Sequence, residues 1–128
     1  MKNLAILGRI LFALPFGLMG LNHFLMTNTF LGMMSSFVPA GAYTILLVGA
    51  MMIAASISII LNKYIRLTCF SLAGLLLIFI LSIHIPGLFT DNWQLALVEL
   101  LKDTSIMGGA ILFGIYSETS CYKPQEQK

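Results

Sequence analysis

The chain has 128 residues, of which 59% are hydrophobic and 9% charged, and its mean hydropathy is +0.95. A soluble domain carries about 25% charged residues, so this chain lacks the polar residues to cover a globule in water. We therefore expect most of its surface to contact lipid. The net charge of +2 is too weak to indicate a nucleic-acid partner. These values exclude both a soluble protein and a disordered one, and the length suits a single domain.

Four uninterrupted apolar stretches follow one another along the chain, each near the roughly 20 residues that a helix needs to cross a bilayer. They do not alternate between apolar and polar residues, which argues against a β-barrel. We therefore expect an all-α fold, an integral membrane bundle of four transmembrane helices in residues 1–116, with a polar tail at 117–128. The predicted spans are Leu4–Met26, Ala40–Leu61, Leu67–Ile85 and Leu95–Tyr116.

The first stretch also has the beginning of a secretory signal peptide, because Lys2 precedes an apolar run. Arg9 interrupts that run, however, and no small-residue cleavage site follows Leu21. The stretch is also long enough to cross a bilayer. We therefore interpret it as the first span.

The segment Thr27–Pro39 separates the first two spans and has apolar side chains at helical spacing, with Thr, Asn and Ser between them. This pattern predicts a segment that lies along the membrane interface. There it either covers polar groups of the bundle or serves as a plain connector. The apolar positions are Phe30, Leu31, Met34 and Phe37.

The distribution of Lys and Arg predicts the orientation of the bundle. In a four-span chain both termini and the middle turn share one face, and loops 27–39 and 86–94 on the opposite face contain no Lys or Arg. The positive-inside rule then places both termini in the cytoplasm. Cys69 and Cys121 fall at or beyond the cytoplasmic helix ends, where reducing surroundings disfavour a disulfide. The basic residues on the cytoplasmic face are Lys2, Lys63, Arg66, Lys123 and Lys128.

Several polar side chains lie near the outer ends of the spans. Inserting an ionisable group into a bilayer costs on the order of 2.5–3.5 kcal/mol, so such a group needs a polar partner or a function. Three of them, spaced i, i+3 and i+4 on the fourth span, share one helical face. We expect all of them to converge in one polar layer in the outer half of the membrane. The candidate ligand-binding residues are Asn22, His23, His84, Glu99, Lys102 and Asp103.

Two interpretations of this layer remain open. It can line a cavity in which a histidine exchanges protons and Lys102 with the carboxylates holds a polar ligand such as a quinone headgroup. Alternatively, the groups neutralise one another and lock the helices together, and His84 is an interfacial residue in contact with lipid headgroups. A haem held by His23 and His84 is disfavoured by their position near the membrane surface and the charges around them. The sequence contains no metal-site signature.

Short motifs distributed over residues 4–116 resemble the DoxX family of small four-helix membrane proteins. Their order and spacing carry the resemblance, since each motif alone is short. The chain departs from the family pattern in lacking a basic residue close after Asn22 and in carrying Asp103 where Asn is frequent. The motifs are Leu7–Leu11, Gly20–His23, Val38–Pro39, His84–Gly87, Leu101–Asp103 and Gly108–Gly109.

The resemblance implies a protein of the bacterial cytoplasmic membrane, since some DoxX relatives are the membrane subunit of thiosulfate:quinone oxidoreductase and others are linked to thiol and oxidative stress. This chain has no Fe–S or nucleotide motif, so a redox role requires a partner protein or a diffusible quinone. We expect the chain to be a membrane subunit that associates with an oxidoreductase. Its partners are then membrane lipids and a redox protein, and it can also form oligomers. The alternatives are a non-catalytic anchor for another protein and a carrier of a small solute.

Overall fold

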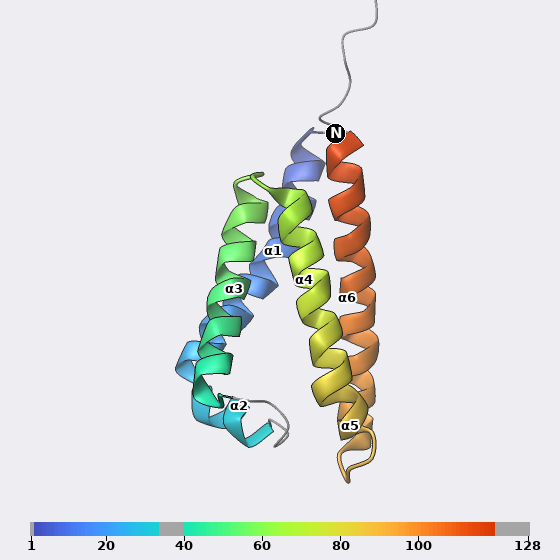
Figure 1. Ribbon diagram of the computed structural model, residues 1–128. Coiled ribbons are helices and arrows are strands. Elements are labelled where there is room, and N and C mark those ends of the chain that lie inside the picture. The colour runs from blue at the N-terminus through green and yellow to red at the C-terminus, as the bar shows by residue number, and fades with distance from the viewer. Residues whose placement is uncertain (1, 34–39, 120–128) are drawn as a thin grey trace, which may run out of the picture.

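The computed structural model describes residues 2–33 and 40–119, and every regular element among them is a helix (Figure 1). The predicted all-α fold class is therefore confirmed for this part of the chain. The π-helical turn η1 joins α4 to α5, so that these three elements form one continuous helical rod. The elements are α1 (Lys2–Leu25), α2 (Thr27–Met33), α3 (Ala42–Ile60), α4 (Ile65–Phe79), η1 (Ile80–His84), α5 (Ile85–Gly87) and α6 (Trp93–Thr119).

The long helices run up and down in two pairs. The start of α1, the turn between α3 and α4, and the end of α6 lie at one end of the molecule, and α2 and α5 lie at the other (Figure 1). Helix α1 packs mainly against α3, and α4 packs mainly against α6. The two pairs diverge toward the end that carries α2 and α5 (Figure 1).

Glycine residues allow α1 and α3 to approach closely. A Cβ atom at Gly20 would lie 2.7 Å from the carbonyl oxygen of Gly49, and one at Gly49 would lie 2.8 Å from the Cβ of His23. Such distances leave no room for a larger side chain, as in other membrane helix pairs that pack through small residues. One turn earlier in α1, a Cβ at Gly17 would lie 2.8 Å from Ser56 Oγ.

Toward the end of the bundle that carries the start of α1 and the end of α6, aromatic rings join the two pairs. The ring of Phe12 on α1 packs edge to face against Phe16, with centroids 5.4 Å apart, and against Phe113 of α6, with centroids 5.8 Å apart. Ala13 and Ala110 are buried on the same two helices. The hydrophobic core therefore closes the bundle at this end.

The tight turn between α3 and α4 depends on two residues in the left-handed backbone region. Asn62 has φ 58° and Tyr64 has φ 53°, a conformation that Asn adopts readily and that is uncommon for Tyr. Ser58 reinforces the turn, because its hydroxyl donates to the carbonyl oxygen of Lys63 and lies 2.8 Å from Thr68 Oγ1. These bonds connect both helices directly at the turn.

The third predicted span ends differently from the expectation. The helix was expected to stop at Ile85, before Pro86, but it continues through the turn η1 to Gly87. Proline has no N–H to donate to the carbonyl four residues earlier, and the π-helical turn ahead of it instead pairs the N–H of Ile85 with the carbonyl of Ile80. The π-helical turn therefore accommodates the proline without ending the helix.

Three helical segments in the described residues are long and apolar enough to cross a membrane: Asn3–Leu25, Ala42–Ile60 and Ile65–Gly87. Only 17–39% of the most apolar stretch of each is buried, so most of their apolar surface faces outward, as expected for contact with lipid. The fourth predicted span, Leu95–Tyr116, lies within the helix α6, but α6 is not among these three. Its charged residues, Glu99, Lys102 and Asp103, lower its hydropathy.

Candidate functional site

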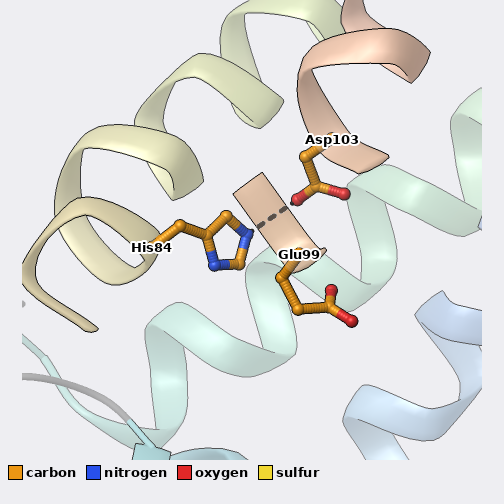
Figure 2. Close-up of side chains that lie close together, drawn as sticks. All are labelled: His84, Glu99 and Asp103. Carbon is orange, nitrogen blue, oxygen red and sulfur yellow. Dashed lines mark hydrogen bonds and ion pairs between the residues drawn. The ribbon is translucent and has the colours of Figure 1, made fainter. Parts of the chain in front are cut away.

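The candidate site lies where η1 packs against the first half of α6. Glu99, Lys102 and Asp103 share one face of α6, and His84 is the last residue of η1. His84 Nε2 lies 2.8 Å from Asp103 Oδ2 and forms a hydrogen bond with it. Figure 2 shows the imidazole of His84 facing the Asp103 carboxylate, with Glu99 nearby on the same helix.

Lys102 extends this pair into a connected group of four residues. Its ammonium donates a hydrogen bond to Glu99 Oε2 and lies 3.7 Å from Asp103 Oδ1. The side chains of His84 and Asp103 are 12% and 9% exposed, whereas those of Lys102 and Glu99 are 42% and 36% exposed. The group therefore runs from a buried His–Asp pair to a half-exposed Lys–Glu pair.

The π-helical turn is important for this geometry. A π-helical turn adds one residue to a helical turn and often occurs at functional sites. Here η1 ends at His84, and its imidazole meets the buried carboxylate of Asp103. Pro86 follows two residues later and cannot form an ordinary α-helical hydrogen bond.

Hydrogen bonds and close charge contacts among the described residues connect four of the six polar residues expected in one layer, and the other two lie on α1. His23 lies on α1, and its Nδ1 is 2.7 Å from the carbonyl oxygen of Met19 on the same helix. Asn22 is exposed on α1, and within the described ranges no hydrogen bond connects either residue to the group on η1 and α6. The physical reason is the divergence of the two helix pairs, which separates residues that share a depth along the bundle (Figure 1).

The short helix α2 covers His23. The ring of Phe30 stacks on the imidazole, with centroids 4.3 Å apart and planes 13° apart. Thr27 Oγ1 also donates to the carbonyl of His23 at 2.8 Å. The helical spacing of this segment is therefore confirmed over Thr27–Met33, where the helix covers a histidine, although Met34 and Phe37 lie outside the described residues.

A set of possible metal ligands within this group was not anticipated from the sequence. His84, Glu99 and Asp103 each offer a ligand atom, and these three atoms lie within 4.8 Å of one another. Glu99 and Asp103 are recognisable in the sequence as an i, i+4 pair, but His84 is 15 residues before Glu99 and on another element. Helix packing alone completes the set.

No family model, curated protein or solved structure matches this chain.

Proposed function

We propose that the chain is a DoxX-like, four-span subunit of the bacterial cytoplasmic membrane that binds a quinone headgroup for a partner oxidoreductase. Three helices with the length and apolarity of membrane spans support the membrane assignment. Helix α6 is the fourth span in this proposal, since its 27 residues extend about 40 Å and it packs along α4.

The observation that carries the proposed ligand is the buried His84–Asp103 pair beside Lys102. A quinone headgroup has two carbonyl oxygens that accept hydrogen bonds, and both the Lys102 ammonium and an N–H of His84 are donors. Asp103 bonds to the imidazole and fixes the orientation of its ring. The two donors can therefore hold a quinone headgroup by its oxygens at this site.

The electrons for that reduction come from a partner in this proposal. The sequence contains no Fe–S or nucleotide-binding motif, and the hard redox chemistry of such reactions is carried by a cofactor. The chain then contributes a headgroup site within the membrane and a surface for the partner enzyme. Lys63 and Arg66, at the turn between α3 and α4, support a cytoplasmic position for that end.

A second candidate is a non-catalytic anchor for another membrane protein. It is favoured by the pairing of the polar groups, since Lys102 bonds to Glu99 and His84 bonds to Asp103. The His84–Asp103 bond holds η1 against α6 without a ligand, while Lys102 balances the charge of Glu99 on α6 itself. An anchor needs no headgroup site, so the two candidates differ in what the purified protein retains.

Native purification with lipids and partners, followed by mass spectrometry, tests the proposal. We expect quinone to be retained by the native protein, lost from His84→Ala and Lys102→Ala, and kept by His23→Ala, whose residue is bonded to its own helix. A co-purified oxidoreductase without quinone would support the anchor instead. Recovery of an intact protein with neither quinone nor a redox enzyme would contradict both candidates.

A further inference from the structure

We propose that His84, Glu99 and Asp103 form a binding site for a divalent transition metal ion such as Zn²⁺. The site uses one imidazole nitrogen and two carboxylates contributed by η1 and α6. This inference goes beyond the proposed function, because metal binding does not require a quinone or a partner protein.

The positions of the ligand atoms are close to those of a metal site. All three lie within 4.8 Å of one another, whereas ligands at Zn–N and Zn–O distances of about 2.0–2.2 Å in a tetrahedron are about 3.3–3.6 Å apart. His84 Nε2 and Asp103 Oδ2, now 2.8 Å apart, have to separate slightly. Glu99 has to approach by about 1 Å, which its half-exposed, flexible side chain allows.

The chemistry of the ligand set favours a transition metal over Mg²⁺ or Ca²⁺. An imidazole nitrogen suits Zn²⁺, whereas Mg²⁺ and Ca²⁺ prefer oxygen ligands alone. Metal binding requires His84 to present the lone pair of Nε2 and to keep its ring proton on Nδ1. Three protein ligands leave the fourth tetrahedral position to water.

In this structure the Lys102 ammonium provides the positive charge that a metal ion would bring to the site. Its ammonium bonds to Glu99 and lies 3.7 Å from Asp103, so one positive charge faces two carboxylates. With His84 neutral, these three charged groups carry a net charge of −1, which favours a second positive charge. Because Lys102 is 42% exposed, its long side chain can turn toward water or lipid headgroups when a metal ion enters.

The site is also accessible from the end of the bundle that carries α5. Glu99 is the seventh residue of α6 and lies about 9 Å from the helix start. His84 lies three residues before the end of α5. An ion therefore enters from the membrane surface without crossing the hydrophobic core near Phe12.

Titration of the metal-free, full-length protein with ZnCl₂ tests this proposal, using a version without a polyhistidine tag, in detergent and without quinone. Isothermal titration calorimetry should show one Zn²⁺ per chain. We expect His84→Gln and Asp103→Asn to weaken binding at least tenfold. Matched control variants are His23→Gln, whose ring bonds to Met19, and Asp91→Asn in the exposed loop before α6.

The variant Lys102→Gln gives the most specific outcome, because it removes the competing charge from an exposed position and leaves the three ligands in place. We expect its affinity for Zn²⁺ to rise about tenfold while quinone retention falls, so the metal site and the quinone site are tested separately. Unchanged or weaker Zn²⁺ binding by Lys102→Gln would overturn the metal proposal. Equal loss of binding in the His23→Gln or Asp91→Asn controls would also overturn it.

Discussion

Asp103 connects the most polar contacts of the molecule. It is buried on α6, bonds to His84 of η1 and faces the ammonium of Lys102. A buried carboxylate is tolerated only when its neighbours satisfy it. The Asp103 side chain therefore provides the polar contact between η1 and α6.

Replacing this side chain should distinguish the hydrogen bond from the charge. Asp103→Ala leaves His84 without its partner, and we expect a loss of about 1–3 kcal/mol of stability. Asp103→Asn keeps an oxygen that accepts from His84 Nε2, so its loss should be smaller. Thermal unfolding in detergent, followed by circular dichroism, measures both, with the exposed Asp91→Ala as a control. Equal stability of Asp103→Ala and the wild type would contradict a structural role for the pair.

The four residues of this site were predicted to meet in one polar layer, but the same prediction also placed Asn22 and His23 there. The i, i+3 and i+4 spacing places Glu99, Lys102 and Asp103 on one helical face, and the structure brings His84 to that face. No sequence pattern indicates that α1 diverges from α6, and this divergence leaves His23 bonded to Met19 instead. Depth in the membrane follows from counting residues, whereas lateral position depends on which helices pack together.

At the scale of elements, close packing of α1 on α3 depends on Gly20 and Gly49. Small residues recur at every fourth position of α3, at Ala50, Ala54 and Ser58, a spacing typical of close helix packing. Ala50 and Ala54 are nevertheless exposed, while Gly49, which lies outside that spacing, provides the contact. The periodicity of small residues therefore predicts close packing but not which face is used.

Adding a methyl group at this contact should destabilise the pair of helices. In Gly49→Ala the new Cβ would lie 2.8 Å from the Cβ of His23 and 2.9 Å from the carbonyl oxygen of Gly20, so we expect a loss of about 1–3 kcal/mol. Gly108→Ala is the matched control, because a Cβ there meets nothing within 4 Å. Thermal unfolding compares the two variants. Similar unfolding temperatures for both variants would show that α1 and α3 can move apart with little loss of stability.

At the scale of the whole molecule, the two termini of the described chain and the turn between α3 and α4 share one end (Figure 1). This is the arrangement expected for four antiparallel spans. Lys63 and Arg66 lie at this end, whereas the loop around Thr90 at the other end contains no Lys or Arg. The positive-inside rule therefore predicts that the end with Lys63 and Arg66 faces the cytoplasm.

Cysteine labelling in intact cells tests this orientation. In a chain whose native cysteines are replaced, Thr90→Cys should react with a membrane-impermeant maleimide from outside. Asn62→Cys, in the exposed turn between α3 and α4, should react only after the membrane is permeabilised. The reverse pattern would show that the bundle is inserted the other way round, and labelling of both positions from one side would contradict the four-span topology.

The division into two helix pairs also follows the order of the chain, and this matters for biosynthesis. Helices α1 and α3, which form one close interface, are both complete once residue 60 has been made, whereas the partner helices α4 and α6 end at residues 79 and 119. Ribosomes add about 5–20 residues per second, so about 3–12 s separate the synthesis of residue 60 from that of residue 119. The first pair can therefore assemble in the membrane as a helical hairpin before α6 leaves the ribosome. The contacts between the pairs, such as Phe12 with Phe113 and Ser58 with Thr68, form as the later helices are made.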